Sequence, residues 1–199
     1  MADEVITGFG RTGQWFASQT MELEPDMMAL AKGLTSGYVP MSAVMVGDRV
    51  ANKLVADGGE FYHGFTYSGH PVAAAVPLAN LELIEREDMI TRVREDTGPY
   101  LAEALAPLAE HRIVGEIRTF GVLAAIELVK SKDGPEMFGD TGATGVICRD
   151  HAINRGLMMR AVRDAMILSP ALTYSRADID ETVRIAAQAL DATADQLGL

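Results

Sequence analysis

Lysine is scarce in this sequence, and one lysine stands in a context suited to covalent chemistry. Lys32 ends the apolar run Met27-Met-Ala-Leu-Ala and is followed by Gly33. Partial desolvation at the end of such a run favours the neutral amine, which is the nucleophilic form. The glycine allows a ligand or another segment of backbone to approach closely. The alternative is a lysine with a buried stem whose ammonium group reaches water.

Two carboxylates and a glycine-rich turn precede this lysine. Asp3 and Glu4 open a strand expected over residues 2–7, where a carboxylate either ends the strand in solvent or faces a cationic ligand. Gly8-Phe-Gly-Arg-Thr-Gly13 matches the G-x-G-x-x-G pattern of nicotinamide dinucleotide sites. That fingerprint requires an acidic residue about 20 positions further on, where the sequence has apolar residues around Leu30. The pattern therefore favours an irregular turn over a nicotinamide site.

A loop expected over residues 58–71 carries groups that suit a phosphate. Thr66 and Ser68 offer hydroxyls, and the backbone N–H groups around them add donors, although a plain turn has the same composition. His63 and His70 have no acidic partner at ligand spacing and are expected to be polar loop residues. The sequence indicates no metal site.

The elements that must position these residues are those of an α/β protein. Arg160 is expected on a strand, where its side chain either points into a pocket or is a half-exposed charge. Helices are expected over residues 14–21, 71–88, 100–110 and 142–154, and after residue 175. Strands are expected over residues 42–46 and 120–129, and as a hairpin of 157–162 with 165–168. Pro77 predicts a kink or a later start of its helix, and Ser175 with Asp178 forms a capping box.

Composition limits the classes of function. The chain has 199 residues and a net charge of −11, which argues against nucleic acid and anionic membrane surfaces as general partners. The single Cys148 excludes an internal disulfide bond. No apolar run reaches the roughly 18 residues of a membrane span, and residues 1–4 do not resemble a secretory signal. A cytoplasmic protein is expected.

Taken together, three ordered segments resemble the class III aminotransferases, which are pyridoxal-phosphate enzymes of fold type I, and most closely the omega-amino-acid:pyruvate type. Asp3-Glu-Val-Ile-Thr-Gly-Phe-Gly-Arg-Thr-Gly13 is similar to the cofactor strand and turn of the family. Pro25 to Pro40 is similar to its Schiff-base segment, and His63-Gly-Phe-Thr-Tyr-Ser-Gly-His-Pro71 to its phosphate-contacting loop. The resemblance continues through Val114-Gly-Glu-Ile-Arg118 and Gly156-Leu-Met-Met-Arg160.

The resemblance implies a role for each matching residue. Lys32 would carry pyridoxal 5'-phosphate and later shuttle a proton, and Asp3 would pair with the pyridinium nitrogen. Val5 would lie on the same side of the strand and pack against the ring. Thr66, with the backbone near Phe65, would bind the phosphate of a partner subunit's cofactor, which implies a homodimer. Arg160 would bind the carboxylate of the keto acid acceptor.

The resemblance also implies a partial fold type I transferase. Residues 1–97 would be the C-terminal part of the large cofactor-binding domain, and residues 98–199 the small C-terminal α/β domain. The expected reaction moves an amino group from an amine or omega-amino acid to a keto acid such as pyruvate. Two alternatives remain open: a non-catalytic remnant of an aminotransferase that binds no cofactor, and a nicotinamide-dependent oxidoreductase that uses the glycines of residues 8–13.

Overall fold

The computed structural model describes residues 1–134 and 136–199. The chain divides into two compact units, Met1–Arg92 and Val93–Leu199. Each unit contains its own sheet. The assignment of residues 1–97 and 98–199 to the two domains of the family stays a prediction.

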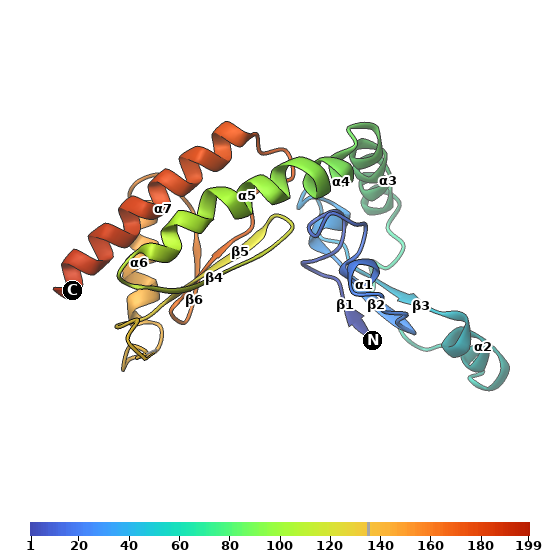
Figure 1. Ribbon diagram of the computed structural model, residues 1–199. Helices are drawn as coiled ribbons and strands as arrows, with labels where there is room; N and C mark the ends of the chain where they lie inside the picture. The colour runs from blue at the N-terminus through green and yellow to red at the C-terminus, as the bar shows by residue number, and fades with distance from the viewer. Residues whose placement is uncertain (135) are drawn as a thin grey trace. The chain divides into compact units, whose positions relative to one another are not determined.

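The first unit is built on a three-stranded sheet in the order β1-β2-β3 (Figure 1). Strand β1 (Ala2–Asp3) is parallel to β2 (Met27–Leu30), and β2 is antiparallel to β3 (Ala43–Val46). The register pairs Asp3 with Ala29. The strand expected over residues 2–7 is therefore shorter than predicted, because the chain turns away from the sheet after Asp3.

The helical elements of the first unit are α1 (Ala17–Thr20), η1 (Lys32–Leu34), α2 (Asp48–Asp57), α3 (Pro71–Arg86) and α4 (Met89–Arg92). Helix α3 begins at Pro71, whose missing N–H suits the first turn, and continues through Pro77. The expectation that Pro77 delays the start of this helix is therefore wrong. The loop between α2 and α3 lies where the sequence predicts it.

The apolar surface of the first unit is poorly covered. Val44, Met45 and Val46 of β3 are all exposed, although successive side chains of a strand point to opposite faces. No residue of α2 is buried. Both faces of the sheet thus leave apolar side chains in solvent at β3.

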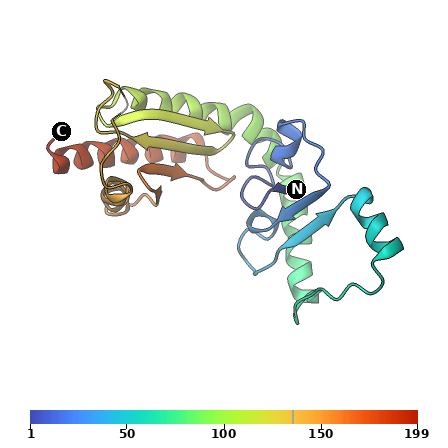
Figure 2. The same cartoon turned by 90° about the horizontal axis from the view of Figure 1, so that it is seen from below.

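The second unit pairs a four-stranded antiparallel sheet with a layer of helices. Its strands, in the order β4-β5-β7-β6, are β4 (Val114–Phe120), β5 (Leu123–Leu128), β6 (Arg160–Val162) and β7 (Ala165–Leu168). Its helical elements are η2 (Val93–Thr97), α5 (Gly98–Leu105), η3 (Ala106–Glu110), α6 (Ala143–Ile153) and α7 (Arg176–Leu197). Helices α5 and α7 lie along the same face of this sheet (Figures 1 and 2). The β6–β7 hairpin is confirmed, and strand β4 is an addition to the expected elements.

A continuous core joins the helices of this unit to the sheet. Ile126 and Leu128 of β5 point into it together with Leu101 and Leu105 of α5 and Leu190 of α7. All five side chains are at most 1% exposed. Burial of an apolar side chain of this size contributes about 1.5–3 kcal/mol, so this core is the main source of stability in the second unit.

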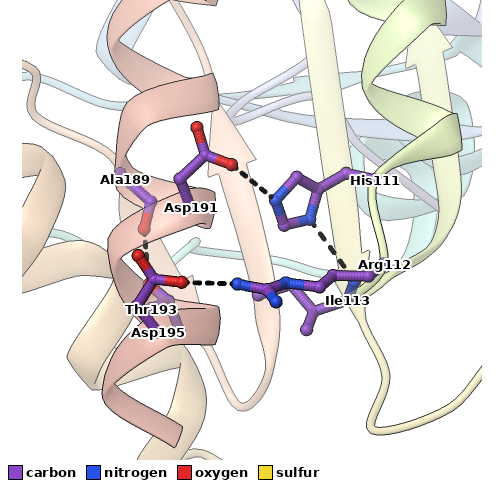
Figure 3. A network of polar contacts seen from close by, with 7 residues as sticks. All are labelled: His111, Arg112, Ile113, Ala189, Asp191, Thr193 and Asp195. Carbon is purple, nitrogen blue, oxygen red and sulfur yellow. Dashed lines mark hydrogen bonds and ion pairs between the residues drawn. The ribbon is translucent and has the colours of Figure 1, made fainter. Parts of the chain in front are cut away.

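Polar contacts fasten the segment before β4 to α7 (Figure 3). His111 Nδ1 accepts a hydrogen bond from the Ile113 N–H over 3.3 Å, so the other ring nitrogen, Nε2, carries the proton and donates to Asp191 over 3.2 Å. Arg112 donates to Asp195 over 2.6 Å. In the described part of the chain, no helix is long and apolar enough to cross a membrane.

Candidate active site

The parallel pairing of β1 and β2 brings the predicted acid and the predicted lysine to one edge of the first sheet. Asp3 is the last residue of β1, and Lys32 follows the last residue of β2 by two positions. Neighbouring parallel strands end at the same edge of a sheet, where α/β proteins bind ligands. The structure therefore places Asp3 and Lys32 at the same edge of the sheet, at the carboxyl ends of the two strands.

Lys32 lies in an unusual backbone conformation and its side chain is exposed. Its φ of +42° is in the left-handed region, which residues with a side chain rarely occupy. The partial desolvation predicted for Lys32 is thus not found in this chain. Within residues 1–134 and 136–199, its ammonium has no hydrogen-bond or ion-pair partner, whereas Lys53, Lys130 and Lys132 contact Asp57, Glu136 and the Ala109 carbonyl, respectively.

Two other segments hold the turn that carries Lys32. Asn80 of α3 donates to the carbonyl of Gly33 over 2.8 Å and to that of Leu34 over 3.2 Å. A Cβ on Gly33 would lie 3.1 Å from Phe9, so the absence of a side chain lets Phe9 pack closely against this turn. Sequence reasoning missed Asn80, because an asparagine in a helix has no local signal for a contact more than 40 residues away.

Asp3 is oriented by the backbone that follows it. Its Oδ1 accepts a hydrogen bond from the Val5 N–H over 3.1 Å, and the side chain is exposed. Val5 is half-buried and lies beyond the end of β1, in the turn that begins there. The strand alternation used to place Val5 on the same side as Asp3 therefore does not extend to it, and contact of Val5 with a cofactor ring stays a prediction.

Glu4 is a buried anchor of the first unit. It is 2% exposed, and its carboxylate accepts hydrogen bonds from the Ala17 N–H over 3.0 Å and from the Ser18 N–H over 2.7 Å. The hydroxyls of Thr7 and Ser18 also donate to it. Burial by itself raises the pKa of Glu4, but the hydrogen bonds from Ser18, Thr7 and Ala17 outweigh burial and hold this pKa below its usual value. Neither of the two roles expected for Glu4, a strand end in solvent or a ligand-binding group, describes this buried carboxylate.

The glycine-rich segment forms an irregular turn, as the sequence favours. Residues 5–12 are turns, and the helix that follows, α1, has only four residues. A dinucleotide fingerprint requires a turn that opens directly onto a helix of the βαβ unit. The local structure therefore does not support the nicotinamide alternative.

The loop with the predicted phosphate-binding residues is exposed. Phe65 and Thr66 begin a turn in which the Ser68 N–H donates to the Phe65 carbonyl over 2.9 Å. The Phe65 N–H itself donates to Ser68 Oγ over 2.9 Å. His70 Nδ1 accepts from the Ala73 N–H at the start of α3 over 3.4 Å, which agrees with a polar loop histidine.

Arg160 belongs to the second unit, on the face of the sheet opposite the core. The register places it in a cross-strand row with Ile167, Ala125 and Arg118. Arg118 forms ion pairs with Glu116 and Glu127, whereas the exposed Arg160 has no such partner among the described residues. An unpaired guanidinium presents several donors in a fork that matches a carboxylate.

Comparison with known proteins identifies the family. The family model described as Aminotransferase class-III matches residues 1–190. The chain belongs to the class III aminotransferases. This family uses pyridoxal phosphate.

The relatives of this class III aminotransferase chain are much longer than the chain itself. It is 53% identical to the putrescine–pyruvate aminotransferase of Pseudomonas aeruginosa over 98% of its own length and 42% of that protein. It is 40% identical to the diaminobutyrate–2-oxoglutarate transaminase of Halomonas elongata, covering 43% of that protein. The crystal structure of the omega transaminase from Pseudomonas jessenii in complex with PMP matches with a TM-score of 0.92 and 40% identity, covering 98% of this chain and 44% of that one. The chain therefore spans less than half the length of these relatives and has the mixed α/β fold of the matching part.

The residues at the sheet edge fit the cofactor of the family in their chemistry. Pyridoxal phosphate has an aldehyde that reacts with an amine and a ring nitrogen that pairs with a carboxylate. Lys32 supplies an unpaired amine, and Asp3 an oriented carboxylate at the same edge of the sheet.

Proposed function

We propose that this chain carries the lysine and the ring-pairing acid of a pyridoxal-phosphate-dependent transaminase. The reaction is transfer of an amino group from an amine or an omega-amino acid to a keto acid such as pyruvate. The observation that carries the proposal is the position of Asp3 and Lys32 at the same edge of a parallel strand pair. The similarity to the putrescine–pyruvate aminotransferase of Pseudomonas aeruginosa supports the choice of donor and acceptor classes.

Each residue would have one task. When bound, pyridoxal phosphate acts as an electron sink for the carbanion formed from the amino donor. The amine of Lys32 would hold the cofactor and afterwards move a proton between the substrate carbon and the cofactor carbon. The carboxylate of Asp3, held by the Val5 N–H, would keep the ring nitrogen protonated. The side chain of Val5 would pack against the ring.

Two further parts of the proposed site contact anionic groups. Thr66, together with the backbone at Phe65, would bind the phosphate of a partner subunit's cofactor, so the active form would be a homodimer. The exposed loop position of both residues leaves them accessible to another chain. Arg160 would bind the acceptor carboxylate through its unpaired guanidinium.

A non-catalytic remnant is the second candidate function. It is favoured by the exposure of Lys32 and by the uncovered apolar side chains of β3, since a working cofactor site is normally enclosed. This candidate predicts a folded chain that is indifferent to pyridoxal phosphate.

Reductive labelling separates the two candidates. The purified chain is mixed with pyridoxal phosphate and reduced with borohydride, and the labelled amines are located by peptide mass. Selective, near-stoichiometric labelling of Lys32 is expected, because its amine alone among the four lysines lacks a partner in the described residues. Lys53, Lys130, Lys132 and the amino group of Met1 are internal controls for nonspecific reaction. Scattered labelling, or a Lys32→Ala chain labelled as strongly as the natural one, would support the remnant.

A further inference from the structure

The turn that carries Lys32 holds a strained backbone and therefore needs support from outside itself. A residue with a side chain in the left-handed region, such as Lys32, is strained and persists only where the surroundings enforce this conformation. Inside the turn, the Leu34 N–H donates to the backbone carbonyl of Ala31 over 3.0 Å, and the Thr35 N–H donates to the backbone carbonyl of Lys32 over 3.1 Å. These bonds span three residues and do not connect the turn to any distant element.

Asn80 supplies that connection with its entire side-chain amide. Its Nδ2 donates to two successive carbonyls, those of Gly33 and Leu34, and its Oδ1 accepts from the Ser36 hydroxyl over 2.7 Å. The carbonyls at the end of a short helical turn have no partners within the turn. Asn80 thus satisfies two of them and contacts three of the four residues that follow Lys32, namely Gly33, Leu34 and Ser36.

The helix that carries Asn80 presents it from a packed face. Pro77 and Ile84 are buried, and they stand three positions before Asn80 and four after it. Residues with this spacing lie on the same side of a helix. Asn80 is half-buried between them, so α3 holds the amide in place against the turn.

We infer that Asn80 is the positioning residue of Lys32: by clamping the Gly33 and Leu34 carbonyls, it holds Lys32 at the carboxyl edge of β2, the same edge of the sheet at which β1 ends with Asp3. The inference rests on the proposed function for the role of the amine, but it makes a separate statement about the turn. Loss of the clamp lets the Lys32 backbone relax and moves its amine away from the sheet edge.

The test compares Asn80→Asp with the natural chain and with Asn52→Asp, a matched change on the exposed helix α2. Aspartate keeps the shape of asparagine but points an oxygen at carbonyl oxygens and has no donor for them. Amide hydrogen exchange is measured at Leu34 and Thr35 and across β2. Lys32 reactivity is measured as its pyridoxal phosphate labelling relative to Lys53 in the same sample.

We expect Asn80→Asp to speed exchange at Leu34 and Thr35 by about tenfold, the effect of losing one or two hydrogen bonds. Exchange in β2 stays unchanged, and the Lys32-to-Lys53 labelling ratio falls by roughly the same factor. Ser36→Ala, which removes one of the three contacts, gives a smaller change in the same direction. Asn52→Asp changes neither measurement.

Unchanged exchange at Leu34 and Thr35 in Asn80→Asp overturns the inference. An equal acceleration throughout β2 also overturns it, because it shows that Asn80 only stabilises the unit as a whole. If the natural chain is not labelled at Lys32, the proposed function fails, while the exchange at Leu34 and Thr35 still decides whether Asn80 holds the turn.

Discussion

At the scale of single residues, the carboxylate of Glu4 fixes the path of the chain between β1 and α1. Strand β1 has only two residues, so its ladder to β2 cannot fix the chain that follows it. The four donors that converge on Glu4 come from Thr7, Ala17 and Ser18 and close the intervening loop. Because Asp3 directly precedes Glu4 in the chain, the hydrogen bonds to Glu4 also fix the backbone position of Asp3, the predicted ring-pairing acid.

The lowered pKa of Glu4 predicts acid sensitivity of the first unit. A carboxyl group with a lower pKa in the folded than in the unfolded chain stabilises the fold above its ordinary pKa, about 4.5. This stabilisation is lost as the pH falls through the folded value. We expect Glu4→Gln to cost about 2–3 kcal/mol at pH 7, the scale of hydrogen bonds to a buried charge, and much less near pH 3.

Trp15 is the only tryptophan and is half-buried within the same loop, so its fluorescence during urea unfolding measures this difference. The matched control is Glu24→Gln, at an exposed position. Equal midpoints for Glu4→Gln and the natural chain at pH 7, or a difference as large at pH 3 as at pH 7, would contradict the prediction.

Residue types and local spacing made part of the candidate site predictable. Lys32 is marked by an apolar run and a glycine, and Asp3 by its place before an apolar strand. Asn80 and two of the partners of Glu4, Ala17 and Ser18, carry no such mark, since their contacts join residues 13 to 47 positions apart. For Lys32 the sequence left two alternatives open, partial desolvation or an ammonium group that reaches water, because the choice depends on which segments cover β2 in space.

At the scale of elements, helix α6 takes its N-terminal cap from a distant turn. Its N-cap residue, Gly142, has no side chain to accept a hydrogen bond. Asp164, in the turn between β6 and β7, accepts from the Gly145 N–H over 2.9 Å, and its own carbonyl accepts from the Leu128 N–H. A Cβ on Gly145 would lie 2.0 Å from the Arg163 carbonyl, so only glycine permits this close contact.

We therefore expect Asp164→Ala to destabilise the second unit by about 1–3 kcal/mol, the cost of an unsatisfied N–H together with a lost cap. Asp164→Asn should cost clearly less. The side-chain carbonyl of the asparagine still accepts a hydrogen bond from the Gly145 N–H. Its NH2 group takes the place of Oδ2, which is buried without a hydrogen-bond partner in the described chain. Urea unfolding followed by the ellipticity of the helices measures both variants.

Asp150→Ala on the exposed side of α6 is the control for a change of charge, since its ion pair with Arg149 is at the surface. The prediction is contradicted if Asp164→Ala is as stable as this control, or if Asp164→Asn is the less stable of the two Asp164 variants.

The N-terminal caps of α6 and α7 show which helix starts can be predicted from sequence patterns. Helix α7 is capped by Ser175, which exchanges hydrogen bonds with Asp178 over 3.3 and 2.8 Å, and this local pair was predicted. The cap of α6 comes from 19 positions away and was not. Strand β4 escaped prediction because it has glycine and charged residues at Gly115, Glu116 and Arg118, and most of its residues are exposed.

At the scale of the whole molecule, the two units differ in how much apolar surface they bury. The buried core of the second unit draws on strands β4, β5 and β7 and on helices α5, α6 and α7. In the first unit, buried apolar side chains are few, and β3 exposes three in a row. The relatives are more than twice as long as this chain, and the uncovered side chains of β3 suit a unit that packs against additional polypeptide.

Unequal burial predicts unequal stability along one chain. We expect urea to unfold the first unit at a lower concentration than the second, so Trp15 fluorescence changes before the amides of α7 lose their protection from hydrogen exchange.

Ile126→Ala, at a fully buried position of β5, should lower the stability of the second unit by about 2–5 kcal/mol. This variant should leave the Trp15 transition in place, whereas Val55→Ala on the exposed side of α2 should move neither transition. A single transition seen at the same urea concentration by both probes, shifted as a whole by Ile126→Ala, would show instead that the two units unfold as one.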